Sequence, residues 1–402
     1  EVQANGLTAV DCGVLPTPAL ALASIGMKSA AVMVTGSHIP ADRNGLKFYV
    51  PSGEIGKADE DLILGALGRQ PFDGPRGALK QCDATSAYVD RYTRAFGHSL
   101  EGLRVGVYQH SSVARDLMVD VMQALGADTV AIARSESFVP VDTEALDPDT
   151  KALFSGWFAN HDLDVLISTD GDADRPMVVD DAQRVVPGDV LGALTARMLG
   201  ADVICTPVSS NTMVDEGFGV IHRTRIGSPF VIAAMEKILA EDASAKVVGY
   251  EANGGFLLGF HAAAPESSLS PLMTRDCLLP IIAPLVLARQ KASDLSQLID
   301  DLPPRFTASD RLQGIATETS KALIQRLSND PHTRAAFFDG MGPESSVVRT
   351  DGLRVQFENG EIVHLRPSGN APELRCYTEA SSRNRASDLL ISYLALLKAK
   401  LE

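Results

Sequence analysis

The sequence predicts an α/β protein of several domains that ends in a domain of α+β type. The 402 residues are too many for one hydrophobic core. Apolar runs of Val, Ile and Ala alternate with amphipathic stretches, as expected for strands buried on both faces of a sheet and for the helices that cover it. After about Leu302 this alternation ends, and three strand-like runs are followed by one long helix.

The α/β pattern can be followed element by element. We expect helices at 114–125, 190–199 and 230–240, and strands at 30–34, 103–108, 129–133, 164–168, 203–206 and 246–249. The tetrapeptide Leu-Gly-Ala-Asp occurs at 125–128 and again at 199–202, each time between a helix and a strand. Its Gly suits a helix C-cap. The repeat indicates either a turn that α/β proteins commonly use or tandem domains of one kind.

The C-terminal part begins after Pro303-Pro304, a dipeptide typical of a linker. We expect a helix at 318–327, a long terminal helix, and strands at 352–357, 361–365 and 373–379. Boundaries near Gly97, Val186 and Leu302 give four segments, which are 1–97, 98–186, 187–302 and 303–402. Because residue 1 is not Met and the chain enters with a strand at 7–12, we expect the first segment to be incomplete at its N-terminus.

Composition narrows the class of protein and of partner. The formal net charge of −15 disfavours nucleic acid or an anionic membrane as partner, but it leaves room for a small anionic substrate. Five scattered cysteines without a CxxC pair argue against a disulfide scaffold or a zinc site and favour a reducing cytoplasm. The longest apolar run, 277–288, contains two prolines and is too short to span a bilayer.

The strongest local signal is Asp170-Gly-Asp172-Ala-Asp174-Arg175. Three carboxylates at alternate positions of a loop can turn toward one hard cation, and such oxygen ligands suit Mg²⁺ or Ca²⁺. An EF-hand would need Gly and Glu where this chain has Arg175 and Asp181, as well as flanking helices where strands are expected. A solvated acidic turn is the other alternative. Arg175 fits a metal ion that binds next to a phosphate, since the arginine and the metal ion would both neutralise the phosphate charge.

The second signal is Thr-Gly-Ser37-His38-Ile-Pro, which follows the expected strand at 30–34. Gly36 permits a tight turn, so Ser37 stands where strand-end residues face a ligand. A serine-hydrolase elbow needs GxSxG, and a phosphate-binding P-loop needs Gly-Lys-Ser/Thr; neither occurs here. Taken alone, Ser37 would be interpreted as a turn serine, and it gains weight only beside the other loops.

Two further loops carry polar side chains between glycines. Glu251 and Asn253 lie two residues apart in Gly-Tyr-Glu-Ala-Asn-Gly-Gly and so point to one side, which suits the vicinal hydroxyls of a sugar. A glycine-rich hairpin is an equal alternative for that stretch. Residues 366–370, Arg-Pro-Ser-Gly-Asn, combine an arginine with short hydrogen-bonding side chains and a backbone N–H nest suited to phosphate.

Taken together and in this order, the four loops resemble those of the α-D-phosphohexomutase superfamily, the phosphomannomutase/phosphoglucomutase enzymes. The Ser37 stretch, with Asn44-Gly45 and Lys47, is similar to the family's phosphoserine loop, and Asp-Gly-Asp-Ala-Asp-Arg is similar to its metal loop. The other two stretches resemble its sugar and phosphate loops. The resemblance covers essentially the whole chain. It implies three tandem related α/β domains plus a C-terminal α+β domain around a central cleft, with one loop from each domain.

The resemblance also implies an activity and its residues. The enzyme would be an isomerase that interconverts hexose 1-phosphate and hexose 6-phosphate through a phosphoserine at Ser37 and a bisphosphorylated sugar. Mg²⁺ would be held by Ser37, Asp170, Asp172 and Asp174. Lys47 or His38 would take the hydroxyl proton, and Arg175 would stabilise the transferred group. Substrate would be bound by Glu251, Asn253, Arg225, Arg366, Ser368, Gly369 and Asn370. Hexose 1,6-bisphosphate is expected as activator, and the protein is expected to be a monomer or dimer.

Some family features are missing from this sequence. The opening Gly-Thr-Ser/Asp-Gly-x-Arg-Gly stretch is absent, which leaves one expected active-site arginine unassigned. Asn253 stands where the sugar loop often has Ser, and Asn-Ala-Pro stands where the phosphate loop usually has Thr-Glu-Pro. We expect mannose phosphate as the preferred substrate, with glucose phosphate also turned over. The alternatives are a phosphoglucosamine mutase, a phosphatase that uses the same phosphoserine, and a non-catalytic member that binds sugar phosphate.

Overall fold

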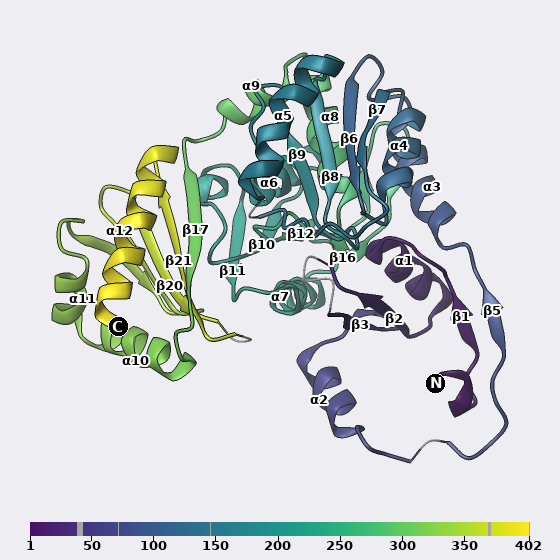
Figure 1. The fold of residues 1–402 in the computed structure, drawn as a ribbon, viewed down its shortest axis with the longest axis horizontal. Coiled ribbons are helices and arrows are strands. Elements are labelled where there is room, and N and C mark those ends of the chain that lie inside the picture. Colours follow the sequence, from purple (N-terminus) through teal and green to yellow (C-terminus); the bar gives the residue numbers. More distant parts are fainter. Residues whose placement is uncertain (38–42, 71, 145, 369–370, 402) are drawn as a thin grey trace. The chain divides into compact units, whose positions relative to one another are not determined.

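The computed structural model describes residues 1–402 except 38–42, 71, 145, 369–370 and 402. It divides into two compact units (Figure 1). The first holds residues 1–205 and 228–299, and the second holds residues 206–227 and 300–402. Across the described parts of the chain, no helix is both long and apolar enough to cross a membrane.

The first unit begins with two small sheets. Strand β1 (Ala9–Asp11) pairs in parallel with β5 (Leu79–Gln81), and β2 (Ala31–Thr35), β3 (Gly45–Val50) and β4 (Gly53–Glu54) form an antiparallel sheet. The helices here are α1 (Thr17–Met27), α2 (Lys57–Gly65) and α3 (Thr85–Phe96), with a 3₁₀ turn η1 (Gln3–Asn5) before them. The strand expected at 30–34 is β2, and it ends two residues before Ser37.

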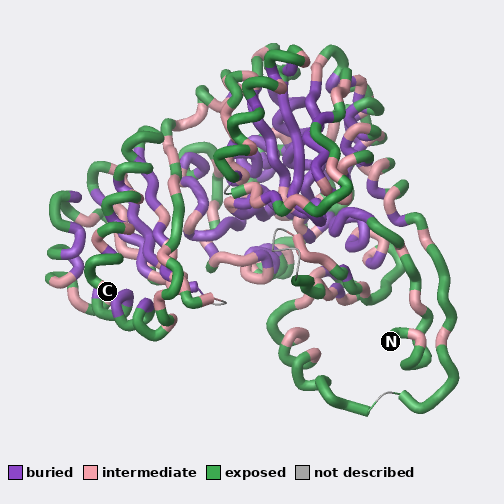
Figure 2. Tube along the Cα trace, in the orientation of Figure 1, coloured by how far each residue is buried: buried purple, intermediate pink, exposed green. Residues whose placement is uncertain are grey.

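The next sheet has the order β7-β6-β8-β9. Its strands are β6 (Arg104–His110), β7 (Asp128–Arg134), β8 (Val165–Thr169) and β9 (Pro176–Val179), and its helices are α4 (Arg115–Ala124) and α5 (Pro148–His161). Strands β6 and β8 are almost wholly buried, as Figure 2 shows, because α4 packs on β6 and β7 while Phe154 and Phe158 of α5 join a core with strand side chains. Burial on both faces explains why these strands could be recognised as continuous apolar runs.

A third sheet in the first unit contains β12 (Val247–Tyr250), β13 (Phe256–Leu258) and β16 (Leu272–Asp276) in neighbouring positions, with β10 (Val203–Pro207) parallel to β12. Strands β12 and β13 form an antiparallel hairpin. The accompanying helices are α6 (Gly188–Met198), α7 (Ser228–Glu241), α8 (Leu278–Gln290) and α9 (Leu295–Asp300), and a two-residue ladder joins β14 (Ala262–Ala263) to β15 (Ser268–Leu269). The apolar run 277–288 is therefore mainly α8, a buried core helix.

Both copies of Leu-Gly-Ala-Asp end a helix as expected. Gly126 follows α4 with φ +91°, and Gly200 follows α6 with φ +66°, which is the left-handed conformation that favours glycine at this position. The chain then enters β7 and β10. The repeated sequence therefore marks the same helix-to-strand turn in two successive α/β layers.

The second unit carries an antiparallel sheet of order β17-β21-β20-β19-β18. Its strands are β17 (Phe306–Gln313), β18 (Glu344–Val348), β19 (Leu353–Phe357), β20 (Ile362–Pro367) and β21 (Glu373–Ala380). Helices α10 (Thr317–Asn329) and α12 (Arg383–Leu401) pack on it, and α11 (Pro331–Phe337), β11 (Val220–Thr224) and the 3₁₀ turn η2 (Thr212–Glu216) complete the unit.

We expected three strands in this C-terminal part, but the sheet has five. Strands β17 and β18 were missed because they are the two edge strands of the sheet and bury few of their side chains. Half-exposed strands carry more polar residues, so they lack the apolar run that identified β19, β20 and β21. The predicted fold class is confirmed: three tandem α/β layers are followed by an α+β domain of helices on an antiparallel sheet.

Candidate active site

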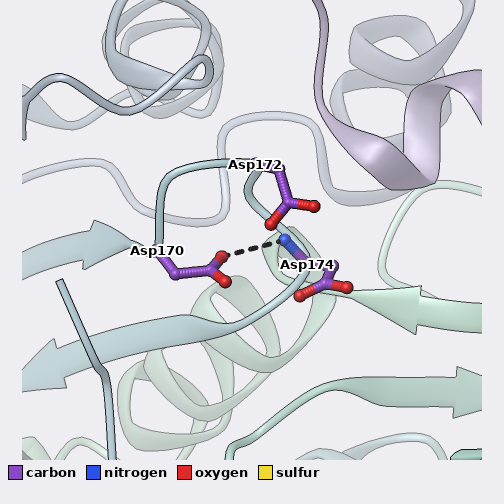
Figure 3. Close-up of side chains that lie close together, drawn as sticks. All are labelled: Asp170, Asp172 and Asp174. Atoms are coloured by element: carbon purple, nitrogen blue, oxygen red, sulfur yellow. Dashed lines mark hydrogen bonds between the residues drawn. The ribbon is translucent and has the colours of Figure 1, made fainter. Parts of the chain in front are cut away.

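Three aspartates meet in the turn between β8 and β9. Asp170, Asp172 and Asp174 are at most 2% exposed, and one carboxylate oxygen from each lies within 4.8 Å of the others (Figure 3). Asp170 Oδ1 accepts the backbone N–H of Asp174 at 3.2 Å, which folds the turn inward. The remaining oxygens Asp172 Oδ1 and Asp174 Oδ1 have no hydrogen-bond partner in the described structure. Buried carboxylates with unsatisfied oxygens fit a hard cation such as Mg²⁺, and the three together can hold a metal ion.

Ser37 lies against this turn although it is 133 residues away in sequence. Its hydroxyl donates to Asp170 Oδ2 at 2.8 Å, and its backbone N–H donates to Thr35 Oγ1 at 2.8 Å. The residue has φ +46°, a conformation that is costly for a side chain other than Gly and that occurs at functional turns. The structure therefore brings the predicted serine to the predicted metal loop.

Gly171 is needed for this approach. A Cβ at that position would lie 2.5 Å from the Ser37 carbonyl oxygen, closer than the 3.0 Å below which real Cβ atoms essentially never come. The glycine between Asp170 and Asp172 thus permits the contact between the two loops.

Two cations form ion pairs with the aspartate cluster. Lys47 Nζ lies 2.6 Å from Asp172 Oδ2 and 2.5 Å from Asp174 Oδ2. Arg275 Nη2 lies 2.8 Å from Asp174 Oδ2. Burial alone would raise the pKa of Asp174, but Arg275 and Lys47 outweigh it and hold that pKa below its ordinary value. Asp170 shows the opposite direction, since burial together with the neighbouring carboxylates raises its pKa.

Arg175 follows the loop and remains close to it. Its Nε lies 3.8 Å from Asp174 Oδ1 and 3.9 Å from Asp170 Oδ2, beyond hydrogen-bond length, and the side chain is 14% exposed. A guanidinium at this range can stabilise a phosphoryl group that binds beside the carboxylates.

The predicted sugar loop is the turn of the β12–β13 hairpin, as the interpretation of this stretch as a glycine-rich hairpin expected. Glu251 and Asn253 are 5% and 9% exposed, and Asn253 Oδ1 accepts the N–H of Gly255 at 3.0 Å. Glu251 Oε2 lies 4.0 Å from Arg275 Nη1. Burial raises the pKa of Glu251, and the charge of Arg275 opposes this. The binding of sugar hydroxyls by this pair stays a prediction.

Sequence reasoning missed Arg275, which joins the aspartate turn to the sugar loop. It lies in β16, and the next residue, Asp276, is 1% exposed and accepts hydrogen bonds from the hydroxyls of Tyr88 and Tyr92 in α3. These bonds anchor β16 and therefore fix the position of the Arg275 backbone. An arginine in a strand that is otherwise largely buried was the available signal.

Thr17 was also missed. Its hydroxyl donates to Asp172 Oδ2 at 2.9 Å, and its backbone N–H donates to the Asp172 carbonyl at 2.9 Å, so the first turn of α1 supports the aspartate turn. The partners are 155 residues apart, and the Pro-Thr-Pro sequence around Thr17 indicates only a helix start.

The second unit holds the predicted phosphate loop. Arg366 Nε donates to Asp351 Oδ2 at 2.9 Å, and the same oxygen accepts the backbone N–H of Ile226 at 3.0 Å. Ser368 is 5% exposed, and its N–H donates to the Glu373 carbonyl at 2.9 Å. Asp351, which was not predicted, therefore ties the 225–227 stretch to Arg366.

Of the remaining predicted residues, one is placed by the structure and three are not. Arg225, which was expected to bind substrate, is exposed at the end of β11. His38, Gly369 and Asn370 lie outside the described residues, so their assignments stay predictions.

Comparison with known proteins finds four successive segments of the chain that match domains of one family. Descriptions of the phosphoglucomutase/phosphomannomutase alpha/beta/alpha domains I, II and III match residues 2–74, 86–183 and 187–306, and that of the C-terminal domain matches residues 313–390. A phosphomannomutase from Sinorhizobium fredii is 43% identical over 98% of this chain and 85% of its own length. One from Salmonella muenchen is 44% identical over 100% of this chain and 84% of its own length.

Two more distant matches are a sequence relative and a solved structure. A phosphoglucosamine mutase from Sphingopyxis alaskensis is 28% identical over 93% of this chain and 80% of its own length. The crystal structure of a phosphoglucomutase/phosphomannomutase family protein from Burkholderia thailandensis superposes with a TM-score of 0.77 at 21% identity, covering 99% of this chain and 84% of that one. On the domain matches and the 43–44% identity, the chain belongs to the phosphoglucomutase/phosphomannomutase family of the α-D-phosphohexomutase superfamily.

Proposed function

We propose that this chain is a phosphomannomutase, which interconverts mannose 1-phosphate and mannose 6-phosphate and also turns over glucose phosphates. The observation that carries the proposal is the 2.8 Å contact between Ser37 Oγ and Asp170 Oδ2 at the edge of the buried aspartate cluster. A serine there can carry a phosphoryl group beside a metal ion. The identity to two phosphomannomutases supports mannose as the hexose.

The chemistry is two phosphoryl transfers in opposite directions. A hydroxyl oxygen of the sugar phosphate attacks phosphorus on Ser37, the bond from phosphorus to Ser37 Oγ breaks, and a bisphosphorylated sugar forms. This sugar turns by half a revolution, and its other phosphate returns to Ser37. The attacking hydroxyl gives its proton to Lys47 or to His38. Transfer of this kind depends mainly on placing the two oxygens in line and neutralising charge.

Asp170, Asp172 and Asp174, with a phosphoryl oxygen on Ser37, would hold Mg²⁺, which polarises the phosphoryl group and offsets its charge. Arg175 and Lys47 add positive charge to the same place. Lys47 already lies within 2.6 Å of two of the carboxylates, so the cluster is built to balance several charges at close range.

The remaining predicted residues are proposed to hold the substrate. Glu251 and Asn253 bind sugar hydroxyls that occupy equivalent positions before and after the half-turn of the sugar. Arg225, Arg366, Ser368, Gly369 and Asn370 bind phosphate. The segments 1–97, 98–186, 187–302 and 303–402 are proposed as the four domains, each with one of these loops. We further propose hexose 1,6-bisphosphate as activator, a cytoplasmic location, and a monomer or dimer in solution.

The test is a mutase assay in which ³¹P NMR reads the position of the phosphate in the product. Mannose 1-phosphate, glucose 1-phosphate and glucosamine 1-phosphate are compared at equal enzyme, with Mg²⁺ and a trace of the bisphosphate. Mannose and glucose phosphates are expected to differ by no more than about tenfold in kcat/KM, because they share O3 and O4 and differ at C2. A strong preference for glucosamine 1-phosphate would overturn the choice of sugar.

Ser37→Ala tests the phosphoserine itself, and Ser345→Ala, at an exposed serine of β18, is the matched control. The first variant is expected to lose turnover and the phosphoryl group that mass spectrometry locates on the Ser37 peptide. The control is expected to keep both. Wild-type turnover in Ser37→Ala would exclude the mechanism, and release of inorganic phosphate without an isomerised product would favour a phosphatase.

A further inference from the structure

We propose that Cys12 and Cys82 form a site of reversible oxidation, in which the two thiols close to an intrachain disulfide. The two residues directly follow β1 and β5, whose parallel pairing matches Asp11 with Gln81. Continued by one residue, that register places Cys12 opposite Cys82.

The backbone shows that the pairing continues to the cysteines. The N–H of Cys82 donates to the carbonyl of Asp11 at 3.0 Å, so the ladder holds at the point where both thiols leave the strands. Neighbouring strands lie about 4.7–4.9 Å apart, within the Cα separations of about 4.4–6.8 Å that disulfides span. Side chains opposite each other in a parallel pair point to the same face of the sheet. Rotation about the Cα–Cβ bonds can then bring the sulfur atoms together.

The pair differs from the other cysteines in its access to solvent. Cys12 and Cys82 are free and half-buried, whereas Cys205, Cys277 and Cys376 are 0% exposed. The Cys12 thiol donates to the carbonyl oxygen of Val10 in β1 at 3.9 Å. Burial raises the pKa of Cys12, and the Cys82 and Asp11 charges add to this. The thiol form therefore predominates near neutral pH, and the reaction should quicken as pH rises toward the thiol pKa, since the thiolate is the nucleophile.

One member of the pair, Cys12, lies beside the functional loops. Cys12 lines a cavity of about 430 Å³ whose wall also includes Ser37, Gly171 and Asp172. Only residues 13–16 separate it from Thr17, which holds Asp172. A bond between Cys12 and Cys82 closes a loop that contains Ser37 and Lys47, so oxidation would restrain the segment that carries the phosphoserine.

The oxidant can be a peroxide. One thiolate attacks a peroxide oxygen, the O–O bond breaks, and a sulfenic acid and hydroxide form. The second thiolate attacks that sulfur, the S–O bond breaks, and hydroxide leaves, so two thiols and one H₂O₂ give a disulfide and two waters. A dithiol reductant reverses the step by thiol–disulfide exchange.

The experiment uses the full 402-residue chain, native and at micromolar concentration. The protein is treated with H₂O₂ or with dithiothreitol, unreacted thiols are alkylated, and peptides are mapped without reduction. The oxidised sample is expected to show a peptide joining Cys12 to Cys82 that has lost two hydrogen atoms, together with a higher Tm than the reduced sample, because the closed loop restricts the unfolded chain. Cys12→Ser and Cys82→Ser should each lack the linked peptide and the Tm difference.

Several results would overturn the proposal. Independent alkylation or sulfinic acid on both cysteines after H₂O₂, without the linked peptide, would show that the sulfur atoms do not meet. A disulfide between two chains, seen as a dimer on a non-reducing gel, would assign the reactivity to collisions. A linked peptide that forms only in urea would show that the folded pairing of β1 and β5 is not its cause. Reversibility is tested separately. Dithiothreitol treatment of the oxidised wild-type protein is expected to return its Tm to that of the reduced sample.

Discussion

Gly171→Ala tests whether the close approach of two loops sets the rate of phosphoryl transfer. The added Cβ would lie 2.5 Å from the Ser37 carbonyl oxygen, whereas real Cβ atoms essentially never come closer than 3.0 Å. The Ser37 loop and the aspartate turn must therefore separate by about 0.5 Å at least. Both sides of this contact are backbone, so no flexible side chain can absorb the displacement.

The magnitude follows from the geometry. Overpacking of this kind costs about 1–3 kcal/mol of stability. A misplacement of about 1 Å can cost about 10²-fold in rate, so a displacement of half that size predicts a loss of about tenfold in kcat. KM for the sugar phosphate should change less, because the proposed substrate contacts at Glu251 and Arg366 are not touched.

The assay is steady-state mutase kinetics with saturating hexose bisphosphate, together with Tm for each variant. Gly156→Ala is the matched control, since Gly156 is exposed within α5 and a Cβ there would meet nothing within 4 Å. The control should keep its kcat and gain about 0.5–1 kcal/mol of stability from the better helix former. A Gly171→Ala enzyme with wild-type kcat would refute the argument that this contact positions Ser37.

Four further variants test two residues of the site, a tyrosine that anchors β16, and His364 of β20 in the second unit. Asp172→Asn should lower kcat sharply and raise the Mg²⁺ concentration needed for half activity, and full activity in excess EDTA would contradict the metal assignment. Arg275→Met leaves buried carboxylates uncompensated and should cost about 3–5 kcal/mol of stability as well as kcat, whereas Arg289→Met, in an exposed contact at the end of α8, should cost little. Tyr92→Phe removes the hydroxyl that donates to the buried carboxylate of Asp276. Denaturant unfolding should show that the free energy of unfolding falls by about 1–3 kcal/mol. Burial lowers the pKa of His364 to about 4, so the unfolded state binds more protons than the folded state between pH 6.5 and 4. The free energy of unfolding should therefore decrease by up to about 3 kcal/mol as the pH falls through that window. His364→Gln should flatten this pH dependence, and an unchanged slope would be evidence against the role of His364.

Local patterns carried much of the fold prediction. Strands such as β6 and β8 and helices such as α4 and α6 could be recognised because burial on both faces, or on one helical face, imposes a period on neighbouring residues. The edge strands β17 and β18 do not bury a whole face, so they left no such pattern.

The same distinction holds for the candidate site. The sequence by itself determined that Asp170, Asp172 and Asp174 share one loop, because their spacing brings the carboxylates together within a single turn. It also identified Ser37 as the residue to test, through a motif contained in a few neighbouring positions.

Only the tertiary structure decided what surrounds that cluster. Ser37 meets Asp170 across 133 residues, and Thr17 meets Asp172 across 155. Arg275 reaches Asp174 from a strand held in place by Asp276, and nothing in the residues next to it encodes that partner. Contacts of this kind depend on how separate α/β layers pack, which is a property of their combined buried surfaces and not of any local period in the sequence.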